Sequence, residues 1–138
     1  MWTSSSRSWR SSPPDAYPQN GAVPKLYFAS PRDLALSEPQ PGIQRRLIPA
    51  DHATIALSDL APRTVIETHK HDTEQVGLVM KGSLVLVIAG EQRILTPGDT
   101  YRVPAGAAHG ARVFEEPSQV LTIWVPPLDE GSRSAHAI

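Results

Sequence analysis

Five histidines occur in this chain, and two of them, His69 and His71, stand one residue apart in the stretch HKHDTEQ. The apolar residues that follow this stretch are typical of a β-strand, in which alternate side chains project from the same face. Both imidazoles then lie on one side, with Cα atoms roughly 6.6–6.8 Å apart. Two nitrogens so placed can converge on one metal ion at roughly 2.0–2.1 Å. The pair therefore predicts half of a metal site.

An oxygen ligand is expected a few residues further along, at Glu74 or Gln75. If the strand alternation continues past Asp72 and Thr73, Gln75 shares the face of His71 and Glu74 faces the other way. A turn at Asp72 and Thr73 would reset this assignment, so both are candidates and Gln75 is preferred. The choice affects chemistry, because a neutral amide leaves a divalent ion with its full charge and a carboxylate does not.

The segment GDTYRVPAGAAHG at 98–110 ends with a third histidine, His109. Together with the first stretch it resembles the two motifs of the cupin family. The first motif is a histidine pair, a Glu or Gln and a glycine, and it is similar here to His69, His71, Gln75 (or Glu74) and Gly82. The second is similar to Gly98, Pro104, Gly106 and His109.

This resemblance implies an all-β, single-domain fold, namely a double-stranded β-helix that forms a small barrel of the jelly-roll type. It also implies that the barrel mouth holds one divalent transition metal ion (Fe, Mn, Ni, Zn or Co), with the ligands His69, His71, Gln75 and His109. The two remaining histidines are expected outside the site, His52 in an exposed loop and His136 in a tail.

Turn-forming residues divide the chain into short segments. With 14 prolines and 9 glycines, no long helical pattern with a clear apolar stripe survives, which indicates an all-β protein. Strands are expected at 54–57, 65–71, 75–80, 84–88, 93–95, 100–103, 110–114 and 120–125. We expect one domain at 23–128, between a disordered Ser- and Pro-rich tail at 1–22 and a loose tail at 129–138.

Strand alternation also selects residues for the rest of the pocket. Counting back from His69 places Glu67 on the inward face, either as a catalytic acid or base or as a rim carboxylate paired with a basic residue. Four further residues are candidates for substrate binding. Only one of Tyr101 and Arg102 is expected to face inward, while Thr122 and Trp124 share a face, where the indole forms either a wall for a ring or part of the core.

Residues 42–127 are similar, within the cupins, to the small proteins of pectin and alginate breakdown that help open unsaturated uronates to linear keto forms. The similarity is carried by GIQRR near 42, by both motifs and by VPP after the final strand. One departure lies in the last strand, where that group has an acid two residues before an aromatic and this chain has Thr122 before Trp124. Threonine is no general base at neutral pH without an activating partner.

The balance of acidic and basic residues argues against some classes of binding partner. With 13 Lys plus Arg against 14 Asp plus Glu, the chain has no basic surface for nucleic acid or an anionic membrane, and it contains no cysteine. It also lacks an apolar run that could span a membrane, so we expect a cytoplasmic protein that binds a small molecule. Because cupins of this size often pair, a homodimer is expected, in which the segment VPKLYFAS at 23–30 adds a strand to the partner.

The resulting function is a metal-dependent enzyme that acts on a small oxygenated substrate. The expected reaction is isomerisation, tautomerisation, cyclisation or elimination by a lyase, with the ion as Lewis acid. One alternative is an Fe-dependent dioxygenase, which would consume oxygen. Another is a non-catalytic protein that binds a metabolite or stores metal.

Overall fold

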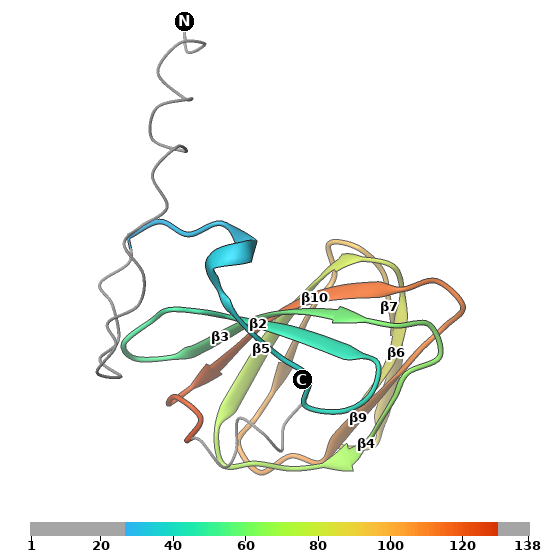
Figure 1. Ribbon diagram of the computed structural model, residues 1–138. Coiled ribbons are helices and arrows are strands. Elements are labelled where there is room, and N and C mark those ends of the chain that lie inside the picture. The colour runs from blue at the N-terminus through green and yellow to red at the C-terminus, as the bar shows by residue number, and fades with distance from the viewer. Residues whose placement is uncertain (1–26, 130–138) are drawn as a thin grey trace, which may run out of the picture.

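The computed structural model describes residues 27–129, which contain ten strands and one short 3-10 helix, Pro31–Asp33 (Figure 1). The strands are β1 (Ala35–Ser37), β2 (Ile43–Ile48), β3 (Thr54–Leu60), β4 (Val65–His69), β5 (Glu74–Lys81), β6 (Leu84–Ile88), β7 (Glu91–Leu95), β8 (Thr100–Val103), β9 (His109–Val113) and β10 (Ser118–Val125). The all-β prediction is confirmed.

The strands form two sheets that face each other across the core (Figure 1). The six-stranded sheet has the order β1-β2-β3-β10-β5-β8, and the four-stranded sheet has the order β4-β9-β6-β7. The pairing is antiparallel, and it places β10 between β3 and β5 and β9 between β4 and β6. Strands far apart in the sequence thereby become neighbours, as in a jelly roll.

The core is built from the inward residues of both sheets. In β3 and β10, buried and partly buried residues alternate strictly, as the period of a strand requires. The most deeply buried aliphatic side chains, each at most 1% exposed, are Ile43, Leu60, Val79, Leu84, Val103 and Val120.

All eight predicted strands exist, two of them (84–88 and 100–103) with the predicted ends and six with shifted ends, but β1 and β2 were missed. The sequence of β2, IQRRLI, lacks apolar alternation because Arg45 occupies an inward position and is only 2% exposed. A buried arginine therefore hid the strand. The predicted strand at 65–71 ends earlier, at His69.

A β-bulge between β4 and β9 corrects the inward face of β4. Ile66 pairs with Ala111 and His69 pairs with His109, so two residues, Glu67 and Thr68, lie opposite Gly110 alone. Ile66 is buried and Glu67 is exposed. The predicted inward orientation of Glu67 is therefore wrong, because simple alternation does not pass through a bulge.

The predicted tails, 1–22 and 130–138 of the segment 129–138, lie outside the described residues. Of the segment 23–30, only residues 27–30 are described, and they are not in a strand. Within the described range, no helix is long and apolar enough to cross a membrane.

Gly110 is expected to be essential to the bulge. A Cβ atom at this position would lie 2.9 Å from the carbonyl oxygen of Ile66 and 3.2 Å from the amide nitrogen of Thr68. We expect Gly110→Ala to lower the free energy of unfolding by roughly 1–3 kcal/mol, as for other overpacked sites. Urea denaturation measures this, with the exposed Arg112→Ala on the same strand as control. Equal midpoints for Gly110→Ala and wild type would contradict the role given to Gly110.

Candidate metal centre

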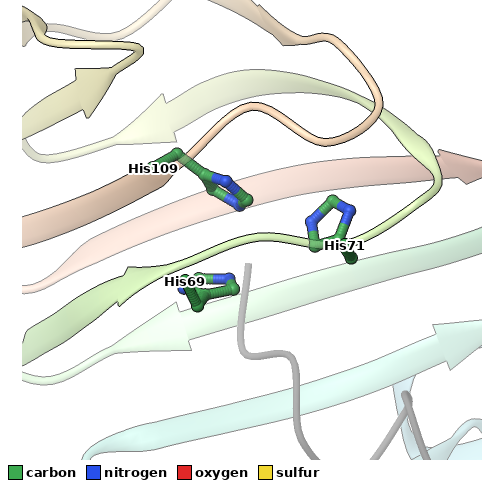
Figure 2. A group of neighbouring side chains, drawn as sticks. All are labelled: His69, His71 and His109. Atoms are coloured by element: carbon green, nitrogen blue, oxygen red, sulfur yellow. The ribbon is translucent and has the colours of Figure 1, made fainter.

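Three histidines meet at one end of the barrel because of the strand pairing. His69 ends β4, His109 begins β9, and the two are cross-strand partners. His71 follows in the link between β4 and β5. The ring centroid of His109 lies 4.2 Å from that of His69 and 4.8 Å from that of His71, and Figure 2 shows the three rings side by side. One nitrogen from each ring lies within 4.8 Å of the others, so together they could hold a metal ion.

The backbone sets the orientation of each ring. Nδ1 of His69 lies 2.9 Å from the carbonyl oxygen of Glu67, and Nδ1 of His109 lies 3.0 Å from that of Ala107. Because a carbonyl only accepts, these contacts favour the ring proton of His69 and His109 on Nδ1, which leaves the lone pair of Nε2 free to bind a metal ion. Nδ1 of His71 lies 3.0 Å from the carbonyl oxygen of Thr73. Three such imidazoles fit a divalent transition metal.

Gln75 supplies an oxygen beside this group. It is fully buried, and its Oε1 lies 2.9 Å from Nε2 of His71. The indole Nε1–H of Trp124 donates to the same Oε1 over 3.2 Å. Since an indole nitrogen only donates, this contact fixes which end of the amide faces His71. The predicted orientation of Gln75 is confirmed, whereas its coordination of a metal stays a prediction.

Glu74, the alternative ligand, faces the other way. Its carboxylate lies 3.4 Å from Nη1 of Arg102, and the side chains of Glu74 and Arg102 are 49% and 64% exposed. Such a surface pair contributes little to stability. Glu74 is therefore placed away from the histidines.

The opposite end of the Gln75 amide joins a buried hydroxyl pair. Nε2 of Gln75 donates to the Tyr101 hydroxyl over 3.3 Å, and that oxygen lies 3.4 Å from Oγ1 of Thr122. The Tyr101 ring packs so closely on Gly77 that a Cβ atom there would overlap it. Burial raises the pKa of Tyr101 above its ordinary value of 10.0, although hydrogen bonds with Thr122 and Gln75 partly oppose the shift.

The four predicted substrate-binding residues thus divide into two groups. Tyr101 faces inward and Arg102 outward, as expected for neighbours on a strand. Thr122 and Trp124 share a face and are both fully buried, and Trp124 packs against Ala56 and Leu128. The structure therefore places three of the four behind Gln75, and contact of any of them with a substrate stays a prediction.

Two other predicted residues, Glu67 and His52, have exposed side chains. Glu67 contacts His69 through its backbone carbonyl, while its side chain is exposed, so a catalytic role for that carboxylate stays a prediction. His52 is exposed in the turn before β3, as expected. His136 lies outside the described residues.

Two cavities adjoin the buried network. The larger, about 670 Å³, lies between β7 and β8 and includes Tyr101 and Arg102 in its lining. The smaller, about 380 Å³, is lined by His71 and by Lys70, Asp72, Thr73, Pro127, Leu128 and Asp129. Of these two, the smaller cavity is the one that reaches a candidate ligand.

Thr73 is a contact of the centre that sequence reasoning missed. Its hydroxyl oxygen lies 3.0 Å from Nδ1 of His71, and the residue is 9% exposed. A hydroxyl residue two positions after a candidate ligand is the signal that the sequence offers. The turn predicted at Asp72 and Thr73 does not by itself indicate this contact.

The raised pKa of Tyr101 is expected to make the free energy of unfolding decrease at alkaline pH. Above a pH of about 10 the unfolded chain releases the Tyr101 proton and the folded protein retains it, so the free energy of unfolding falls as pH rises further. We expect this decline to be shallower in Tyr101→Phe, which has no proton to lose. Urea denaturation of both proteins from about pH 9 to about pH 11 measures the slopes. Identical slopes would show that Tyr101 ionises equally in both states.

Comparison with known proteins agrees with this geometry. Residues 56–125 match the family profile described as "Cupin domain". The pectin degradation protein KdgF of Dickeya dadantii (strain 3937) is 34% identical over 87 residues, which are 62% of this chain and 79% of that protein. H2HPP isomerase of Bacillus subtilis is 31% identical over 108 residues, 78% of this chain but 44% of that protein, so the chain spans less than half of its length.

Among solved structures, KdgF from Halomonas sp. superimposes with a TM-score of 0.70 at 27% identity, covering 75% of this chain and 96% of that chain. The resemblance found in the two histidine motifs is thereby confirmed, as is the barrel fold it implied. Because the family profile spans half of the sequence and includes His69, His71 and His109, the chain belongs to the cupin family.

Proposed function

We propose that this cupin is a metal-dependent enzyme that acts on a small oxygenated substrate such as a sugar, a keto acid or a polyketide-like molecule. The proposed reaction class is isomerisation, tautomerisation, cyclisation or lyase chemistry. The convergence of three imidazole nitrogens within 4.8 Å carries this proposal. A divalent ion bound there would supply Lewis acidity toward a carbonyl or hydroxyl oxygen of the substrate.

The proposed ligands are His69, His71, His109 and Gln75. All four are neutral, so they would offset none of the charge of a divalent ion. Trp124 uses one lone pair of Gln75 Oε1, and the second is left for the side of Nε2 of His71, 2.9 Å away. The amide is thus held in place for coordination by a contact that does not block it.

The descriptions of the relatives support the proposed class more than the alternative of an Fe-dependent dioxygenase. One is described as a pectin degradation protein and the other as an isomerase. This chain has Thr122 near Gln75 and no carboxylate at that position, so we infer that it does not move a proton from the last strand.

Proton transfer is better supported on the side of the smaller cavity. Asp72 and Asp129 both line that cavity next to His71, and Lys70 adds a cation there. A carboxylate at the edge of a cavity that reaches a ligand is well placed to exchange protons with both substrate and solvent. We therefore propose Asp72 or Asp129 as the acid or base, with Glu67 as the alternative.

The proposed partner is a small molecule in the cytoplasm. The nearly equal numbers of basic and acidic residues, 13 and 14, favour neither nucleic acid nor an anionic membrane, and the lack of cysteine is compatible with a reducing compartment.

The outer surface of the six-stranded sheet supports pairing with a second copy. In one row across the sheet, Ile123 lies between Ile55 and Val76, and Ile55 is also next to Ile48. In the next row, Leu121 lies between Leu57 and Leu78. We call these seven residues the aliphatic face. Contiguous apolar surface of this kind marks interaction sites.

The flanks of the aliphatic face are electrically balanced. Arg46 pairs with Asp59 at 3.5 Å on one flank, and Arg102 pairs with Glu74 at 3.4 Å on the other. A second copy turned over a two-fold axis therefore meets no net charge of its own sign.

The aliphatic face alone is smaller than the surface that a stable dimer buries. Four strands of this length present roughly 300 Å², and a stable partner surface is about 800 Å². Tyr27 and Phe28, 85% and 80% exposed, would add much of the difference if they packed on the partner. We propose a homodimer through the aliphatic face with these aromatic residues at its border.

Leu121→Lys at the centre of the aliphatic face is expected to convert the dimer into a monomer, because a buried unpaired charge costs several kcal/mol. Sedimentation equilibrium measures this. Gln92→Lys, which adds the same charge on exposed β7 of the other sheet, is the control and should remain dimeric. A wild-type protein that is monomeric at about 100 μM, or a dimeric Leu121→Lys, would overturn the proposal.

Metal binding is expected at about one ion per chain in the purified protein, as a single centre requires. His109→Ala should lose this ion and Gln75→Leu should bind it more weakly, while Glu74→Leu should retain it. Elemental analysis after dialysis measures the content, and circular dichroism confirms the fold. Equal metal content in wild type and His109→Ala would disprove the metal centre.

The reaction class is tested with zinc, which is redox-inert. Zinc-loaded protein is expected to convert an unsaturated uronate or a keto acid into an isomer without consuming oxygen. Turnover that requires iron and oxygen would instead establish a dioxygenase. Saturable binding without turnover would establish a non-catalytic cupin.

A further inference from the structure

Thr73 offers two different hydrogen-bonding groups to one nitrogen of His71. Its carbonyl oxygen and its hydroxyl oxygen each lie 3.0 Å from Nδ1. The carbonyl oxygen only accepts, whereas the hydroxyl can also donate. Nδ1 of His71 is therefore satisfied whether or not it carries the ring proton.

Nδ1 of each of the other two histidines faces a backbone carbonyl oxygen. The atom that faces Nδ1 is the carbonyl oxygen of Glu67 for His69 and the carbonyl oxygen of Ala107 for His109. Both contacts favour the tautomer with the proton on Nδ1. His71 thus combines the geometry of a ligand with a second hydrogen-bonding option.

The contact of Nε2, the second ring nitrogen of His71, determines which tautomer is favoured without a metal. Nε2 lies 2.9 Å from Oε1 of Gln75, whose identity as the amide oxygen is fixed by the indole of Trp124. With the proton on Nδ1, the lone pairs of Nε2 and Oε1 face each other and repel. With the proton on Nε2, that nitrogen donates to Oε1 and the Thr73 hydroxyl donates to Nδ1, so both contacts are favourable.

Metal coordination requires the opposite arrangement. Nε2 must then present its lone pair, and the proton must be on Nδ1, where the carbonyl oxygen of Thr73 accepts it. The proton count of the ring is the same in both states. Only its position changes, by exchange with solvent, and the hydroxyl of Thr73 rotates away from Nδ1.

We propose that Thr73 is a positioning residue that allows His71 to change tautomer when the centre is loaded. This inference rests on the metal centre proposed above. Metal-free protein has His71 protonated on Nε2, bonded to Gln75 and Thr73. Loaded protein has it protonated on Nδ1, with the ring in the same place. The hydroxyl of Thr73 therefore stabilises the metal-free state, so its removal strengthens metal binding.

Nitrogen-15 NMR of the histidine side chains tests the proposed change of tautomer of His71 without any activity assay. In the full chain stripped of metal, His71 is expected as the Nε2–H tautomer, while His69 and His109 are Nδ1–H. Addition of zinc should change His71 to Nδ1–H and leave the other two as they are. If His71 is already Nδ1–H without metal, the inference is wrong even when zinc binds normally, which separates it from the proposed metal centre.

Thr73→Val tests whether the hydroxyl stabilises the metal-free state, because valine keeps the shape of the threonine side chain and lacks the hydroxyl. We expect it to increase the Nδ1–H fraction of His71 in metal-free protein and to tighten zinc binding about threefold to tenfold by calorimetry, since one hydrogen bond of the competing state is lost. Thr73→Ser keeps the hydroxyl and should bind zinc like wild type. Weaker zinc binding by Thr73→Val, with Thr73→Ser unchanged, would show that the hydroxyl supports the loaded state instead.

Discussion

The cross-strand pair of His69 and His109 is the contact on which the rest of the centre depends. It joins β4 to β9 at the barrel end, and the bulge opposite Gly110 turns His69 to the same side as the buried Ile66. Without the extra residue, the period of the strand would place His69 and Ile66 on opposite faces. The irregularity in the ladder is therefore what makes a three-histidine group possible on these strands.

The centre also connects the two sheets. His69 and His109 belong to the four-stranded sheet, whereas Gln75 and Trp124 lie on adjacent strands of the six-stranded sheet. Buried polar groups are costly unless their partners are present, so the hydrogen bonds from Trp124 to Gln75 and from Gln75 to Tyr101 hold these side chains in one arrangement. A glycine at position 77 leaves the space that the Tyr101 ring needs.

Much of this arrangement could be predicted from local sequence rules. The inward side of Gln75 and the opposite directions of Tyr101 and Arg102 agree with strand alternation, and alternate burial continues through His71 and Thr73 although β4 ends at His69. The inward orientation of Glu67 could not be predicted, because a bulge depends on the partner strand and leaves no mark in the sequence of β4. Likewise β2 was hidden because Arg45 is buried through contacts of the folded barrel, which a hydropathy pattern does not contain.

The charge of the surrounding side chains can explain why position 122 is a threonine and not an acid. Behind the histidines the buried side chains Gln75, Trp124, Tyr101 and Thr122 are all neutral near neutral pH, and burial moves the pKa of Tyr101 still further above that range. The charged groups of the smaller cavity, Lys70, Asp72 and Asp129, lie instead around His71. A carboxylate buried at position 122 would need a partner or a proton. The buried side chains behind the histidines are thus neutral, and the charged side chains of this region line the smaller cavity.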